Sequence, residues 1–135
     1  MYRTQKGFTL IELIVVIVLL GILGVTALGK FQNMSLSATN ATIQGFASEI
    51  TGGSNINYAA SITGLGTATA ITGTPTCDTT LANSMLASPL PADYTVGDTA
   101  VPPVACVAGN AFQCNIDHTD TGTTAAAATF ICTGT

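Results

Sequence analysis

The stretch that decides the fold is KGFTLIELIVVIVLLGILGVTALGK, residues 6–30. Between Leu13 and Leu28 no side chain is charged, and almost all are aliphatic. Counted from Phe8, the apolar run is about twenty-one residues long, and at ~1.5 Å per residue a helix of that length spans the ~30 Å hydrocarbon layer of a bilayer. The sequence therefore predicts a membrane-length helix near its N-terminus.

The rest of the chain is also poor in charge. Of its 135 residues 47% are hydrophobic and only 7% are charged, whereas about a quarter are charged in ordinary soluble proteins. The mean hydropathy is +0.53, so we do not expect a freely soluble cytosolic monomer. The length suits one small domain rather than an ordinary enzyme fold with its own substrate domain. The formal charge of −4 argues against a general nucleic-acid-binding surface, which would need a basic stripe.

Two simple interpretations of the apolar run are a cleaved secretory signal and a plain membrane anchor. A secretory signal would use Arg3 and Lys6 as its basic start. However, the run is long for a signal, and no small-x-small cleavage site stands clear of it. A plain anchor fits the length, but it gives no role to Glu12.

Glu12 is a carboxylate placed near the start of a membrane-length helix. Such a group costs a few kcal/mol even on lenient insertion scales, and an unpaired buried charge is much less stable than a paired one. Lys6 is the nearest basic side chain, and it lies two turns back, before the apolar run. Glu12 therefore predicts a positive partner that comes from another molecule or from a newly made chain terminus.

The segment Lys6-Gly7-Phe8-Thr9-Leu10-Ile11-Glu12, followed at once by the apolar run, resembles the class III signal of type IV pilins and the related pseudopilins. The shared features are a short basic leader, Gly before the scissile bond, Phe after it and Glu at the fifth mature position. The resemblance covers about residues 1–46. Within it, similarity to the mannose-sensitive haemagglutinin group of pilins rests on Gly21-Ile22-Leu23, Lys30-Phe31 and Ala41-Thr42-Ile43.

The resemblance implies that residues 1–7 are a leader, which prepilin peptidase removes between Gly7 and Phe8, and that the new Phe8 amine is N-methylated. Residues 8–29 would hold the precursor in the bacterial inner membrane. They would then form the core of an extracellular filament, built from copies of the chain by the pilus assembly machinery. In that filament Glu12 would meet the Phe8 ammonium of a neighbouring copy.

Cleavage would also change the charge of the chain. Loss of Arg3 and Lys6 would take the formal side-chain charge from −4 to −6, with Lys30 the only remaining basic side chain.

One position departs from the family pattern. Many pilins have a proline twenty-one residues after the mature Phe, where this chain has Gly29. Gly21, Gly24 and Gly29 each cost up to ~1 kcal/mol relative to Ala inside a helix, so they are candidate weak points of the helix. The alternative is that these glycines allow close packing between helices.

Residues 8–60 are expected to form one helix, the spine of the fold. Beyond Lys30 it should become amphipathic, because apolar residues recur at helical spacing. Gly52-Gly53 would end most helices, but the sequence after it can continue one, so the expected end is near Ala60. The positions of the apolar face are Leu36, Ile43, Phe46, Ala47 and Ile50.

Residues 61–135 are expected to form a globular head that begins with a loop over residues 61–80. A short helix is predicted over Thr79–Ala87, capped by Asp78 or Thr79. Three or four antiparallel strands would pack on the second half of the spine. The predicted fold class is therefore α+β, a long N-terminal helix on a small antiparallel sheet, as in type IV pilins. The candidate strands are Asp93–Val96, Val104–Val107, Phe112–Ile116 and Ala127–Cys132.

Four cysteines in so small a head predict two disulfides and an oxidising compartment. A zinc site would need paired C-x2-C spacing, which the chain lacks. Four cysteines can form two disulfides in three different pairings. We favour Cys77–Cys106 and Cys114–Cys132, because the second pair would sit on facing strands of a C-terminal hairpin.

The sequence offers no catalytic constellation. His118 is the only histidine, and beside Asp117 and Asp120 it is best interpreted as the solvated tip of a hairpin rather than a metal or acid–base site. We expect no catalytic residues, metal or cofactor.

Three functions remain, each from a different class. The first is a pilin of a type IV filament for adhesion, surface motility or DNA uptake. The second is a pseudopilin of a type II secretion system. The third, a monomeric anchored periplasmic domain, leaves Glu12 and the Gly7–Phe8 junction unexplained.

Overall fold

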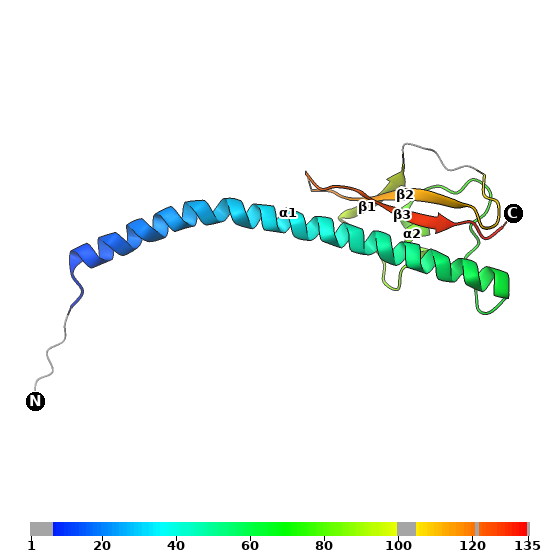
Figure 1. The fold of residues 1–135 in the computed structure, drawn as a ribbon, viewed down its shortest axis with the longest axis horizontal. Coiled ribbons are helices and arrows are strands. Elements are labelled where there is room, and N and C mark those ends of the chain that lie inside the picture. Colours follow the sequence, from blue (N-terminus) through cyan, green and yellow to red (C-terminus); the bar gives the residue numbers. More distant parts are fainter. Residues whose placement is uncertain (1–6, 100–104, 121, 135) are drawn as a thin grey trace, which may run out of the picture. The chain divides into compact units, whose positions relative to one another are not determined.

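The computed structural model describes residues 7–99, 105–120 and 122–134. The chain divides into two compact units, of which the second begins at Ser37. A long helix is followed by a short helix and a three-stranded sheet (Figure 1), which confirms the predicted α+β class. The elements are α1 (Leu10–Thr63), α2 (Thr79–Met85), β1 (Tyr94–Asp98), β2 (Ala111–His118) and β3 (Ala126–Ile131).

The first half of α1 is the predicted apolar segment. An 18-residue window of this helix reaches a mean hydropathy of 2.8, and none of that window is buried within the chain. The helix runs without a break through Gly21, Gly24 and Gly29. By length and composition α1 is therefore able to cross a membrane.

The second half of α1 supplies one wall of the hydrophobic core. Ile43, Ala47 and Ile50 are buried, as their spacing predicted, and Ser54 continues the same face. The helix passes through Gly52-Gly53 and ends at Thr63, three residues later than expected. Gly64 ends it, with φ of +66° and its N–H donating to the Ala60 carbonyl at 3.0 Å, a conformation that glycine adopts at low cost.

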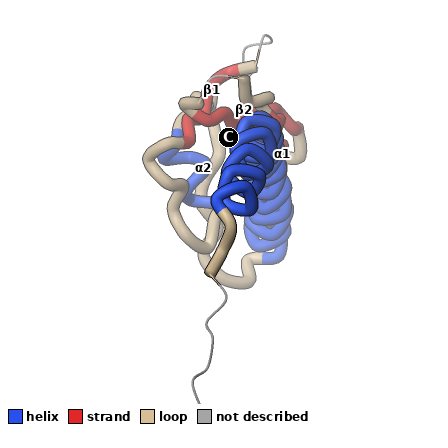
Figure 2. Tube along the Cα trace, turned by 90° about the vertical axis from the view of Figure 1, so that its left-hand side faces the viewer, coloured by secondary structure: helices blue, strands red, loops and turns tan. Residues whose placement is uncertain are grey.

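The sheet supplies the opposite wall. Its order is β1-β2-β3, and both neighbouring pairs are antiparallel. Ile116 of β2, with Ala128 and Phe130 of β3, is fully buried in one core with the buried residues of α1. Figure 1 shows the strands and α2 beside the second half of the helix, and Figure 2 gives the same elements seen from the end of the helix.

The polar side chains of α1 bind the outer edge of β3. Thr129 N–H donates to Thr51 Oγ1 at 3.0 Å, and Ile131 N–H donates to the buried Ser54 Oγ at 2.7 Å. Edge N–H groups that lack partners are templates for pairing with another strand. These hydroxyls therefore accept hydrogen bonds from two edge N–H groups and fix the position of β3 along α1.

The predicted strand at Val104–Val107 is wrong for its described residues, since Ala105–Val107 are not in a strand; Val104 lies outside the described residues. Cys106 is instead bound to Cys132 by a disulfide, and its N–H donates to the Gly73 carbonyl at 2.6 Å. These bonds direct the segment toward the loop after α1 rather than along the sheet.

The predicted disulfide pairing is also wrong. The chain pairs Cys77 with Cys114 and Cys106 with Cys132, each with Cα atoms 5.5 Å apart. The predicted C-terminal hairpin is present as β2 and β3, but its register places Cys114 opposite Ala128. Cys132 is four positions further along, ~13 Å at ~3.3 Å per residue, which is beyond disulfide reach.

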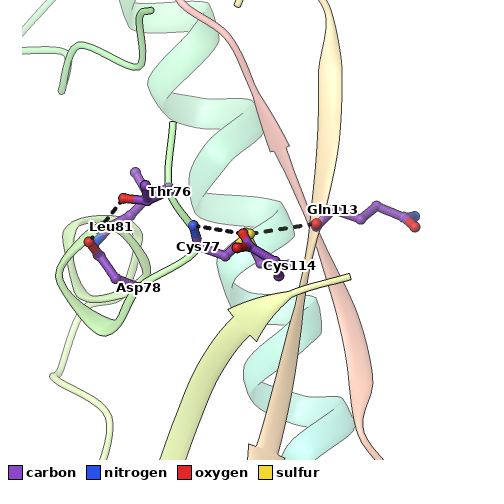
Figure 3. The surroundings of a disulfide bond; sticks show 7 residues. Thr76, Cys77, Asp78, Leu81, Gln113 and Cys114 are labelled. Atoms are coloured by element: carbon purple, nitrogen blue, oxygen red, sulfur yellow. Dashed lines mark hydrogen bonds between the residues drawn. A yellow bond between two sulfur atoms is a disulfide. The ribbon is translucent and has the colours of Figure 1, made fainter. Parts of the chain in front are cut away.

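The Cys77–Cys114 bond connects the start of α2 to the central strand (Figure 3). Asp78, one of the two predicted caps, caps α2 and accepts from Leu81 N–H at 2.7 Å. Cys77 N–H donates to Asp98 Oδ1 at 3.3 Å. The disulfide, the cap and this hydrogen bond therefore fix the segment before α2 at one place beside the sheet.

The close approach of α2 to α1 depends on Gly53. A Cβ atom there would overlap the carbonyl oxygen of Met85 at the end of α2. The neighbouring Gly52 has nothing within 4 Å of a Cβ position. Gly53 is thus required by packing, although glycine is unfavourable inside a helix.

We predict that Gly53→Ala destabilises the second unit by at least about 2 kcal/mol, because a backbone carbonyl cannot move aside as a flexible side chain does. Gly52→Ala is the matched control and should be neutral or stabilising by up to ~1 kcal/mol. Thermal unfolding of the full chain in detergent, followed by near-ultraviolet circular dichroism, measures both. Equal melting temperatures for the two variants would contradict the assignment.

Candidate functional site

The candidate assembly site is the start of α1. Gly7, Phe8 and Thr9 precede the helix, and Glu12 lies in its first turn. Arg3 and Lys6 of the expected leader lie outside the described residues. The site thus combines a non-helical segment, which contains the expected cleavage position, with a carboxylate one turn into the helix.

Thr9 and Glu12 bind each other across the first turn. Glu12 N–H donates to Thr9 Oγ1 at 3.4 Å, while Thr9 N–H and Oγ1–H donate to Glu12 Oε2 at 3.3 and 3.2 Å. This reciprocal pattern is a capping box, which satisfies N–H groups that a helix start would leave without partners. The carboxylate also lies at the positive end of the helix dipole.

The capping box adds neutral partners for Glu12 that were not predicted from the sequence. Thr9 supplies two hydrogen bonds, and the helix dipole favours the negative charge. The sequence carried this signal, because Thr9-x-x-Glu12 is the S/T-x-x-E pattern of a helix start. Hydrogen bonds from neutral groups still leave the carboxylate charged, so the need for a positive partner in an apolar environment remains.

An extensive apolar surface surrounds this site. Phe8 is 90% exposed, and the large apolar side chains from Leu10 to Leu28 are 45–76% exposed. Soluble monomers rarely expose contiguous apolar patches of more than a few hundred Å². Such a surface is typical of a helix that a bilayer or other helices cover.

The three glycines of this segment remain candidate weak points. Gly21, Gly24 and Gly29 have no atom of the chain within 4 Å of a Cβ position, apart from the helix's own nearby backbone. Among the described residues, no packing contact therefore requires glycine at these positions. Their expected role as weak points stays a prediction.

The expectation of a solvated tip at His118 was wrong. Its side chain is 13% exposed, and its ring meets the edge of Tyr94 at 4.8 Å between centroids. Tyr94 in turn meets Phe46 of α1 at 4.9 Å, and Asp120 N–H donates to His118 Nδ1 at 3.1 Å. The rings of His118, Tyr94 and Phe46 thus form a row of edge contacts from the sheet to α1.

Comparison with known proteins identifies the N-terminal segment. Residues 2–28 match the family model described as the prokaryotic N-terminal methylation motif. No curated protein and no solved structure matches the chain. The chain thus carries the class III signal peptide of type IV pilins. This motif is typical of pilins and pseudopilins, which prepilin peptidase processes and which assemble into pilus-like polymers.

We predict that Thr9→Val weakens the start of α1 by about 1 kcal/mol, because it removes the hydroxyl of the capping box. Hydrogen exchange of the first-turn amides in detergent should become about fivefold faster, since 1.4 kcal/mol corresponds to tenfold. Thr9→Ser keeps the hydroxyl and should exchange at the wild-type rate. Unchanged exchange in Thr9→Val would show that the capping box does not form.

Proposed function

We propose that this chain is a structural subunit of a type IV pilus. The observation that carries the proposal is the methylation motif at residues 2–28, joined to a membrane-length helix whose apolar side chains lie exposed in the described part of the chain. The subunit would be stored in the inner membrane and then polymerised through α1 into a filament outside the cell. The filament would serve adhesion, surface motility or DNA uptake.

Processing would occur between Gly7 and Phe8. Both residues precede the helix and are exposed, so a peptidase can bind this segment without unwinding α1. Cleavage would create an ammonium on Phe8, one residue before Thr9, and N-methylation would leave its positive charge in place. The capping box would remain in the mature chain, since Thr9 and Glu12 both follow the cleavage position.

Assembly would pair Glu12 of one copy with the Phe8 ammonium of another. Both hydrogen bonds from Thr9 end on Oε2, so Oε1 is the oxygen that the neighbour's ammonium would meet. In a filament core each charge would then have a counter-ion, and removal of one partner of a buried ion pair costs about 3–5 kcal/mol. The capping box would hold the carboxylate in place before the neighbour arrives.

The second unit suits a position outside the cytoplasm. The disulfides Cys77–Cys114 and Cys106–Cys132 close overlapping loops, and no cysteine of the described residues is free. Disulfides form and persist in the periplasm and at cell surfaces, where the environment is oxidising. A periplasmic pseudopilin of a type II secretion system would share both the motif and this environment, so it is the second candidate.

Deletion of the gene separates these two functions. We expect the deletion strain to lose long surface filaments, seen by negative-stain electron microscopy, and to secrete proteins normally. Expression of the intact chain in the same strain should restore the filaments. Filaments that persist while secretion fails would instead assign the chain to the secretion system.

We predict that Glu12→Gln reaches the membrane at the wild-type level but yields few filaments. Gln keeps the capping box and removes the charge, so each Phe8 ammonium would enter the apolar core without a counter-ion. Glu12→Ala, which loses both the cap and the charge, should assemble no better. Filament yield and membrane level are measured in the same cells, and mass spectrometry checks that the mature N-terminus is methylated Phe8.

The Gln and Ala variants together separate the two roles of Glu12. Wild-type filament yield from Glu12→Gln, with a clear loss in Glu12→Ala, would show that Glu12 acts only as a cap. Wild-type yield from both variants would show that the carboxylate has no part in assembly.

A further inference from the structure

The two disulfides of the second unit alternate along the chain. The first cysteine pairs with the third and the second with the fourth, so that the bonds are Cys77–Cys114 and Cys106–Cys132. A chain that is made from its N-terminus exposes Cys77 and Cys106 before it exposes Cys114. Oxidation in chain order would therefore give the pairs Cys77–Cys106 and Cys114–Cys132, and neither is native.

Loop closure also favours wrong pairs in the unfolded chain. The native bonds join cysteines 37 and 26 residues apart, whereas Cys106 and Cys114 are only 8 residues apart in the sequence. Because closure becomes less probable roughly as the three-halves power of loop length, the shortest loop is favoured about sixfold over one native loop and about tenfold over the other. Neither native disulfide is thus the bond that the unfolded chain forms most readily.

The correct partner of Cys77 is in place only after the sheet has formed. Cys114 is fully buried in the central strand, opposite Asp98 of β1 and Ala128 of β3. Cys106, in contrast, needs no strand to come near Cys77, because its N–H donates to the carbonyl of Gly73, four residues before Cys77. The wrong partner of Cys77 is therefore available before the right one.

A chain with two wrong disulfides has no means of correcting itself. All four cysteines are then used, whereas disulfide exchange requires a thiolate that attacks a disulfide sulfur. A Cys114–Cys132 bond is also incompatible with the register of β2 and β3, in which Cys132 lies four positions beyond the residue opposite Cys114. Such a chain cannot complete its sheet, and its repair requires a thiol from another molecule.

We propose that the second unit is a substrate of a thiol–disulfide isomerase, a partner that supplies this thiolate. In a chain paired in sequence order, the isomerase thiolate attacks Sγ of Cys106, which leaves a mixed disulfide and a Cys77 thiolate. Cys77 then attacks Sγ of Cys114 and releases the Cys132 thiolate. Cys132 attacks Sγ of Cys106 and returns the isomerase thiolate. Three disulfide bonds break and three form, so no oxidant or reductant is consumed.

The inference rests on the proposed position of the second unit outside the cytoplasm. It applies equally to a pilin and to a pseudopilin, because both would be oxidised in the same compartment.

The test compares the intact chain in wild-type cells and in cells that lack the periplasmic isomerase. Free thiols are blocked with a maleimide, and mass spectrometry of peptic fragments maps the disulfides. We expect the share of chains with both native bonds to fall about sixfold without the isomerase, in line with the bias of loop closure. Expression of the isomerase from a plasmid should restore that share, and an equal native share in both strains would overturn the inference.

Two double variants test whether mispairing is the cause. Cys77→Ser, Cys114→Ser leaves one native pair, and Cys106→Ser, Cys132→Ser leaves the other, so neither chain can form a wrong internal bond. In each variant the remaining disulfide should form to the same extent with and without the isomerase. Loss of these single bonds as well would show that the partner acts as an oxidant, which contradicts the proposed exchange.

A measurement without cells checks the need for an external thiol. The reduced, denatured full chain is transferred into detergent and oxidised with copper phenanthroline, which supplies no thiol. We expect mispaired chains that persist until a small amount of reduced glutathione is added, after which the native pairs should form. Native pairing before glutathione is added would overturn the inference. Disulfide mapping is independent of assembly, so a chain that never forms filaments would refute only the proposed function.

Discussion

The second unit has no hydrophobic core without the second half of α1. Ile43 and Ile50 are fully buried in one cluster with Ile116 and Phe130 of the sheet, and no other helix of the described residues is long enough to cover three strands. The same helix carries the apolar segment that needs a bilayer or neighbouring helices. A single unbroken helix therefore joins an exposed apolar segment to one wall of the hydrophobic core.

The sequence predicted those parts of the structure that depend on local pattern. The membrane-length segment, the buried positions Ile43, Ala47 and Ile50 and the cap at Asp78 all follow from periodicity or from residue type. The helix ends at Thr63 rather than near Ala60, because Gly64 adopts a positive φ and ends it. Gly53 lies inside the helix, as expected, and its close contact with Met85 could not be predicted from local pattern.

The disulfides were missed for a different reason. A pattern of alternating residues locates a strand, but it does not fix its register against the next strand, and the pairing depends on that register. The segment before Val107 was missed because a disulfide and a hydrogen bond to residues distant in sequence decide its path. At the candidate site, Glu12 was identified because a charge in an apolar segment costs free energy. Its capping role was missed because the Thr9-x-x-Glu12 pattern was not considered.

The two disulfides also determine how the chain bears mechanical load. The loop closed by Cys77–Cys114 overlaps the loop closed by Cys106–Cys132, so every residue from Cys77 to Cys132 lies within a covalently closed network. Tension applied through α1 can peel the helix from the sheet and straighten the chain up to Cys77. Beyond that point, the shortest covalent path to Cys132 passes through both disulfides and the short segment between Cys106 and Cys114. A stretched subunit would therefore lengthen by a limited amount and then resist.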